Sequence, residues 1–70
     1  MPYYRVWLVK EVDSYWVEAD TEEGAKKLVS LNVFEGENEN ELDCTLDSGM
    51  KLPYGVIVSS VGQTYIVKKN

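Results

Sequence analysis

The sequence predicts an α+β fold, a small and mostly antiparallel sheet with one helix packed on one face, in the order β-β-α-(β)-β-β. Three observations lead to this prediction. Aromatic and β-branched residues alternate with polar ones near both ends of the chain, one amphipathic helical pattern lies between them, and turn-rich segments separate these stretches. A chain of 70 residues with 44% hydrophobic composition makes one globular domain, which we place at residues 1–70.

The first two strands are predicted at 3–10 and 14–19, where the sequence is YYRVWLVK and SYWVEA. A turn at Val12–Asp13 would pair Leu8 with Val17 and place both tryptophans on the face opposite the core. The residues expected on the core face are Tyr4, Val6, Leu8, Tyr15, Val17 and Ala19.

The helix is predicted at 20–32 and is expected to begin with a capping box. Asp20 and Glu23 have the spacing at which each side chain satisfies a free backbone N–H of the first turn. The apolar stripe expected to face the sheet is Ala25, Leu28 and Val29.

The second half of the chain predicts a weak strand at 42–46 and a hairpin around Val61–Gly62. A turn at these two residues divides the hairpin between the two faces of the sheet. The expected division is Val56, Val58, Tyr65 and Val67 on one face, with Ile57 and Ile66 on the other.

Composition limits the function. The net charge of −5 disfavours direct binding to nucleic acid or to a membrane and favours basic protein partners. The absence of histidine and of nucleophile or phosphate-loop motifs predicts that the protein is not an enzyme and takes no cofactor. The single cysteine, Cys44, is interpreted as a small buried hydrophobe. No basic, apolar leader follows Met1 and no apolar run approaches the ~20 residues of a membrane span, so we expect a cytoplasmic protein.

The most unusual segment, EGENENELD at 35–43, is called the acidic run below; its carboxylates are Glu35, Glu37, Glu39, Glu41 and Asp43. A calcium loop needs glycine at its sixth position and glutamate at its twelfth, where a loop starting at Glu35 has Asn40 and Leu46, so we predict no metal site. If extended, the run would present its carboxylates about 6.6 Å apart, comparable with the phosphates of a nucleic-acid strand. The alternative is a solvated loop.

The two tryptophans, Trp7 and Trp16, are predicted to be diagonal neighbours on one sheet face. They are candidates for an anchor patch that contacts a protein partner or a second copy of the chain. Two alternatives stay open. They form a cross-strand pair that the 33–53 segment partly covers, or they stack against single-stranded bases.

The segment YYRVWLVKEV…YWVEADTEEGAKKLV, within residues 3–31, resembles small proteins of bacteriophages and other mobile elements. DpnD/PcfM-like proteins and some anti-CRISPR proteins have a similar strand–strand–helix pattern. The resemblance implies a small accessory or inhibitory protein that acts by contact, and it assigns no residue a role.

The leading hypothesis is therefore a non-enzymatic, phage-encoded binding protein that blocks a basic host or viral protein, such as one that binds nucleic acid. The predicted partner-binding residues are Glu35, Glu37, Glu39, Glu41, Asp43, Trp7 and Trp16. The alternative hypothesis is an assembly protein that forms a homo-oligomer, with a dimer expected, through its apolar sheet face.

Overall fold

One helix and a five-stranded antiparallel sheet make up the fold, which confirms the α+β prediction. The computed structural model describes residues 2–53 and 55–68. In chain order the elements are β1 (Tyr3–Leu8), β2 (Ser14–Glu18), α1 (Glu22–Val33), the 3₁₀ turn η1 (Glu39–Glu41), β3 (Leu42–Leu46), β4 (Val56–Ser59) and β5 (Thr64–Ile66).

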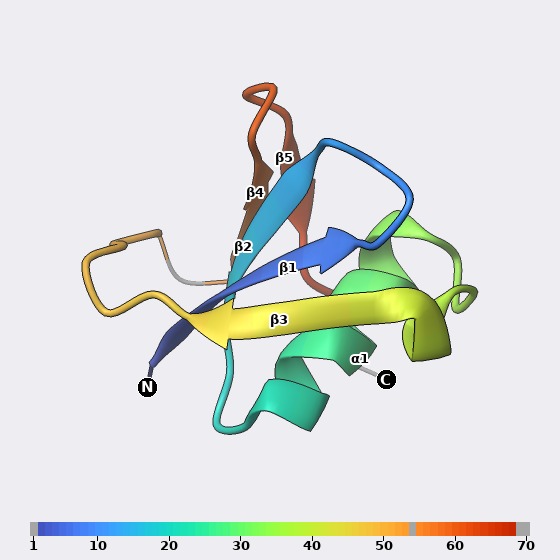
Figure 1. The fold of residues 1–70 in the computed structure, drawn as a ribbon. Coiled ribbons are helices and arrows are strands. Elements are labelled where there is room, and N and C mark those ends of the chain that lie inside the picture. Colours follow the sequence, from blue (N-terminus) through green and yellow to red (C-terminus); the bar gives the residue numbers. More distant parts are fainter. Residues whose placement is uncertain (1, 54, 69–70) are drawn as a thin grey trace.

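The sheet has the strand order β3-β1-β2-β4-β5, so the β1–β2 hairpin is central and β3 and β5 are the edges. After the hairpin the chain passes through α1 and returns as β3 beside β1. It then crosses to the other side of the hairpin, where β4 pairs with β2. The sheet is strongly twisted, so that β3 runs across the view of Figure 1 while β4 and β5 run up it.

The core lies between α1 and one face of the sheet. All six residues expected on the core face of the first hairpin are buried, and Ala25 and Val29 of the helix are buried against them. Leu28 packs at the margin of this cluster, so the predicted apolar stripe of the helix is confirmed. Leu42 and Ile57 complete the core from β3 and β4.

The predicted register of the first hairpin is wrong, although its faces are right. Val17 pairs with Tyr4 rather than with Leu8, and Val6 pairs with Tyr15. The connection is longer than a two-residue turn, because β1 ends at Leu8 and β2 begins only at Ser14, while the N–H of Val9 donates to Glu41, just before β3. The observed pairing differs from the predicted one by an even number of residues, so every side chain stays on its predicted face.

The predicted register of the second hairpin is wrong by one residue, which does change faces. Val56 pairs with Ile66 and Ile57 with Tyr65, so Ile57 joins the core instead of the opposite face. The cause is a three-residue loop, 60–62, in which Gly62 has a φ of 88° and the N–H of Ser59 donates to Gln63.

The helix begins at Glu22, two residues later than predicted, and its N-cap lies one residue later than the predicted Asp20. The N-cap is Thr21, whose hydroxyl accepts a hydrogen bond from the N–H of Gly24 at 3.0 Å. The capping box predicted for Asp20 and Glu23 therefore does not form. Both residues suit an N-terminus, but the third helical position holds glycine, which has no side chain to complete the reciprocal bond.

Candidate protein-binding surface

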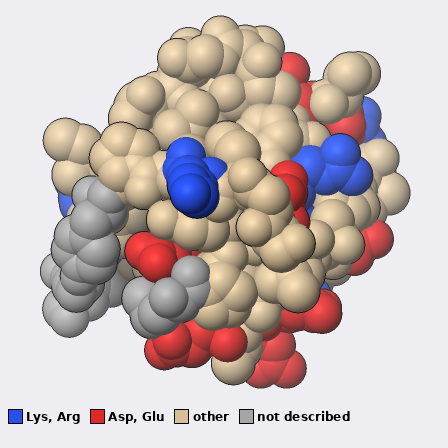
Figure 2. Space-filling model, turned by 90° about the vertical axis from the view of Figure 1, so that its left-hand side faces the viewer, with Lys and Arg blue, Asp and Glu red and all other residues tan. Residues whose placement is uncertain are grey.

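The face of the sheet away from α1, called the outer face below, carries both predicted anchor residues. Trp7 lies opposite Ser14 and Trp16 opposite Arg5, so the two tryptophans are diagonal neighbours, as predicted. Both side chains are half-buried. Seen from the left-hand side of Figure 1, the molecule presents a mostly uncharged surface with acidic groups along its lower and right-hand edges and basic groups near its centre and right (Figure 2).

Trp7 is in contact with a cation of its own strand. The guanidinium carbon of Arg5 lies 4.8 Å from the centre of the Trp7 ring, within the range of a cation–π interaction. Arg5 itself is exposed. A partner that contacts Trp7 therefore also meets a positive charge held over the ring.

Trp16 is fixed by the loop that follows β3. Its indole N–H donates to Oδ2 of Asp47 at 3.0 Å, and the other carboxylate oxygen of Asp47 accepts from the N–H of Gly49 at 3.3 Å. The same loop is attached to β1, because the hydroxyl of Tyr3 donates to the carbonyl of Leu52 at 3.2 Å. The 33–53 segment thus reaches the outer face through its last part, as one alternative had expected.

The acidic run meets the tryptophans at Asp43. This residue lies directly across from Trp7 in the pairing of β1 with β3, so its carboxylate belongs to the outer face. One carboxylate oxygen of Asp43 accepts from the N–H of Cys44 at 2.9 Å. That amide points to the free side of the edge strand, and its bond to a charged residue protects the edge from pairing with another chain.

All five carboxylates of the acidic run are exposed, but the run is not extended. Glu35 and Asn38 have positive φ values of 56° and 67°, and Gly36 has a φ of 85°. Glu39–Glu41 then form the turn η1. The prediction of an extended run with evenly spaced carboxylates is therefore wrong, because three residues with positive φ and a tight turn interrupt the alternation. The run is an exposed loop, as the alternative predicted.

The loop that carries the acidic run is anchored to a buried residue of the helix. Ser30 is only 1% exposed, and its hydroxyl donates to the carbonyl of Glu37 at 2.8 Å. Its own carbonyl accepts from the N–H of Gly36 at 2.8 Å. These bonds hold Glu35 and Glu37 in a defined position relative to the core.

The middle of the acidic run lies near the start of the helix. Glu39 and Asn40 line an open hollow of about 270 Å³ together with Glu23 and Lys26. A basic side chain is thus already present beside this part of the run.

Cys44 is half-buried between β3 and the helix, and its thiol lies 3.7 Å from the carbonyl of Glu22. Burial, followed by the negative charge of Glu22, raises the pKa of the Cys44 thiol above its ordinary value, although Lys26 acts in the opposite direction. A raised pKa leaves little thiolate at neutral pH, which makes this cysteine a poor nucleophile.

Within residues 2–53 and 55–68, no three side chains of His, Cys, Asp or Glu are grouped so that they could hold a metal ion. In the same part of the chain no helix has the length and apolar character needed to cross a bilayer.

The strand period places Arg5 on the same face as Trp7, as the structure has it. Asp47 of the outer face was missed by the sequence analysis. Asp47 lies 31 residues from Trp16 in the chain, so only the fold brings the two together.

Comparisons with known proteins add no relative. No family model, no curated protein and no solved structure matches the chain. The resemblance of residues 3–31 to phage and mobile-element proteins therefore stays a prediction.

Proposed function

We propose that this protein is a non-enzymatic binding protein that inhibits or modulates a basic protein by covering its charged surface. The observation that carries the proposal is the meeting of the acidic run with the tryptophan pair, where Asp43 lies directly opposite Trp7. Exposed carboxylates attract a basic surface from a distance, and half-buried aromatic residues supply the contact area once it has docked.

The conformation of the acidic run supports the proposal. Glu35 has a φ of 56°, a backbone conformation in which glycine or asparagine would be less strained. A glutamate retained at such a position is a reason to infer that its charge is used. The hydroxyl of Ser30 holds the neighbouring Glu37 by its carbonyl, so that the loop presents its carboxylates in a fixed arrangement.

The class of partner follows from charge. A net charge of −5 repels phosphate, so the partner is a protein with a basic surface, and one that binds nucleic acid has such a surface exposed. Occupying that surface would exclude the nucleic acid by contact and by repulsion. The resemblance to phage proteins is compatible with a host or viral target.

The test compares three baits in a pull-down from cells of the source organism, followed by mass spectrometry. One bait is the unchanged protein, and the second carries glutamine at Glu35, Glu37, Glu39 and Glu41. The third is a matched control with Glu11→Gln, Asp13→Asn, Asp20→Asn and Glu22→Gln. Both variants lose four negative charges and so have a net charge of −1 instead of −5.

We expect a basic protein that the unchanged bait and the control retain and the acidic-run variant loses. With that protein purified, association with the acidic-run variant should be slower at low salt by about tenfold, whereas dissociation changes little. Equal loss of the partner by both variants would show that only total charge matters. Retention by all three baits would remove the acidic run from the interface.

A further inference from the structure

We propose that a second copy of this chain pairs with the free edge of β5, antiparallel to it, and joins two five-stranded sheets into one. This inference does not depend on the proposed function, because it concerns the edge of the sheet opposite β3. It rests on the backbone of β5, on the hollow beside it and on the distribution of charge along the chain.

Among residues 2–53 and 55–68, no hydrogen bond engages the backbone groups of β5 that point away from β4. The N–H of Ser59 donates to Gln63 at 2.8 Å and the N–H of Val67 donates to Gly55 at 2.9 Å. In an antiparallel pair the residues that bond to the neighbouring strand alternate with residues whose N–H and C=O point away. Thr64 and Ile66 consequently direct their backbone groups away from β4, toward the free edge.

The free part of this edge has a defined length. The amides that come next on either side of Thr64 and Ile66 in the alternation already donate hydrogen bonds. The N–H of Gly62 donates to Ser59 and the N–H of Lys68 donates to Oδ1 of Asn32. If two copies pair about Tyr65, Thr64 of each copy lies opposite Ile66 of the other. Every free N–H and C=O of the edge then finds a partner.

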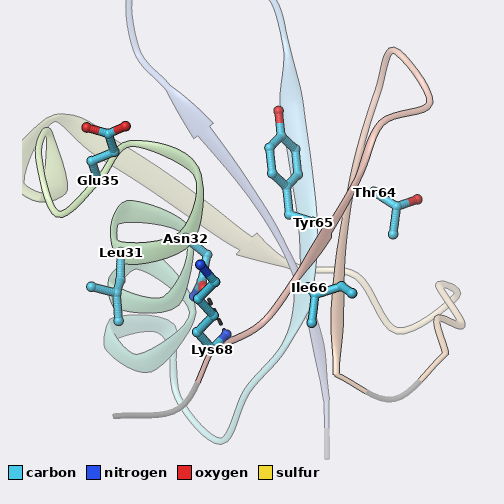
Figure 3. A pocket seen from close by; sticks show the side chains of 7 residues that line it. All are labelled: Leu31, Asn32, Glu35, Thr64, Tyr65, Ile66 and Lys68. Atoms are coloured by element: carbon cyan, nitrogen blue, oxygen red, sulfur yellow. Dashed lines mark hydrogen bonds between the residues drawn. The ribbon is translucent and has the colours of Figure 1, made fainter.

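A hollow of about 460 Å³ lies beside this edge, between β5 and the C-terminal half of α1 (Figure 3). Leu31 lines it from the helix, and Tyr65 and Ile66 line it from the strand. Leu31 is 40% exposed and Ile66 is 74% exposed, so both leave apolar area uncovered beside the edge. A strand added to the edge would cover part of both side chains.

The distribution of charge favours a second copy of this chain as the partner at the edge of β5. The last acidic residue of the sequence is Asp47, so neither β4, β5 nor their loop carries a negative charge. A basic partner gains little attraction at such an edge, and two copies that repel each other elsewhere approach here with the least repulsion. One residue of each charge lines the hollow, Glu35 and Lys68. Two such hollows brought together therefore have no net charge to repel each other.

The test measures the oligomeric state by sedimentation equilibrium from micromolar to millimolar concentration. Thr64→Pro removes one outward-pointing N–H and places a ring at the edge, where proline does not disturb bonds to β4. The matched control is Thr64→Val, which has a similar shape and keeps the N–H. We expect the unchanged protein and the control to dimerise, and the proline variant to bind itself at least about tenfold more weakly, because each copy loses a donor.

A second measurement needs no variant. Hydrogen exchange of the Thr64 and Ile66 amides in the unchanged protein should slow as the concentration rises, while exchange of exposed loop amides stays constant. A protein that is monomeric at millimolar concentration overturns the proposal. A dimer that the proline variant forms equally well also overturns it, and so does a dimer in which these two amides exchange at an unchanged rate. Either result would place the contact on another face of the molecule.

Discussion

Glu35 shows how one residue can reveal a conflict between local stability and function. Its φ of 56° brings the side chain close to its own backbone, a conformation that costs most residues roughly 1 kcal/mol or more. We expect Glu35→Gly to raise the free energy of unfolding by about 0.5–1 kcal/mol, measured by urea denaturation. Glu35→Ala is the control, because it removes the charge but keeps the strain. Equal stability of the two variants would contradict this explanation.

For single residues, the sequence predicted which side chains are exposed better than it predicted which residues they contact. The five carboxylates of the acidic run are exposed, as expected for charged residues among asparagine and glycine. The contact of Trp16 was not predicted, because it depends on another part of the fold. Trp16 needs an acceptor for its indole N–H, and the acceptor that it finds, Asp47, reaches it only after β3 has paired with β1.

The start of α1 is an element-scale difference that mutation can test. Thr21 caps the helix through the N–H of Gly24, whereas Asp20 precedes the cap. Thr21→Ala should lower the free energy of unfolding by about 1 kcal/mol, because it leaves a backbone donor of the first turn without its partner. Asp20→Ala, the matched control, should change it by less than about 0.5 kcal/mol. Thermal or urea unfolding measures both, and the reverse order of effects would restore the capping box.

The two hairpins show why strand registers were harder to predict than strands. Alternation identifies a strand and its two faces, but it is satisfied again after every shift of two residues. The first hairpin was displaced by such an even shift, so its core face was predicted correctly. The second depends on whether its loop has two or three residues. Gly62 suits either loop, and the three-residue loop moved Ile57 into the core.

The charge of the whole molecule is unevenly distributed along the chain. All acidic residues lie at or before Asp47, while the segment that forms β4 and β5 has none. The β1–β2 connection, β2, the helix, the acidic run and the loop after β3 therefore carry the negative charge, whereas β4 and β5 carry none and have Glu35 and Lys68 in the hollow beside them. This separation allows a single small domain to attract a basic partner at one place and to meet its own copy at another.

The two proposed contacts should consequently respond to salt in opposite directions. Attraction between the acidic run and a basic partner is screened by salt, with a Debye length of about 10 Å at 0.1 M, so that complex should weaken as salt rises. Two copies with a net charge of −5 repel each other, and the same screening should strengthen a dimer formed through β5. Sedimentation equilibrium at low and high salt measures the dimer directly.

The variant with Glu11→Gln, Asp13→Asn, Asp20→Asn and Glu22→Gln separates the two effects, because it removes most of the net charge without altering β5 or any residue that lines the hollow beside it. It should dimerise more tightly than the unchanged protein at low salt and show almost no salt dependence, since little repulsion remains to be screened. A dimer of the unchanged protein that weakens with salt would instead be held by opposite charges. Its contact would then involve the acidic run and the lysines rather than the uncharged edge of β5.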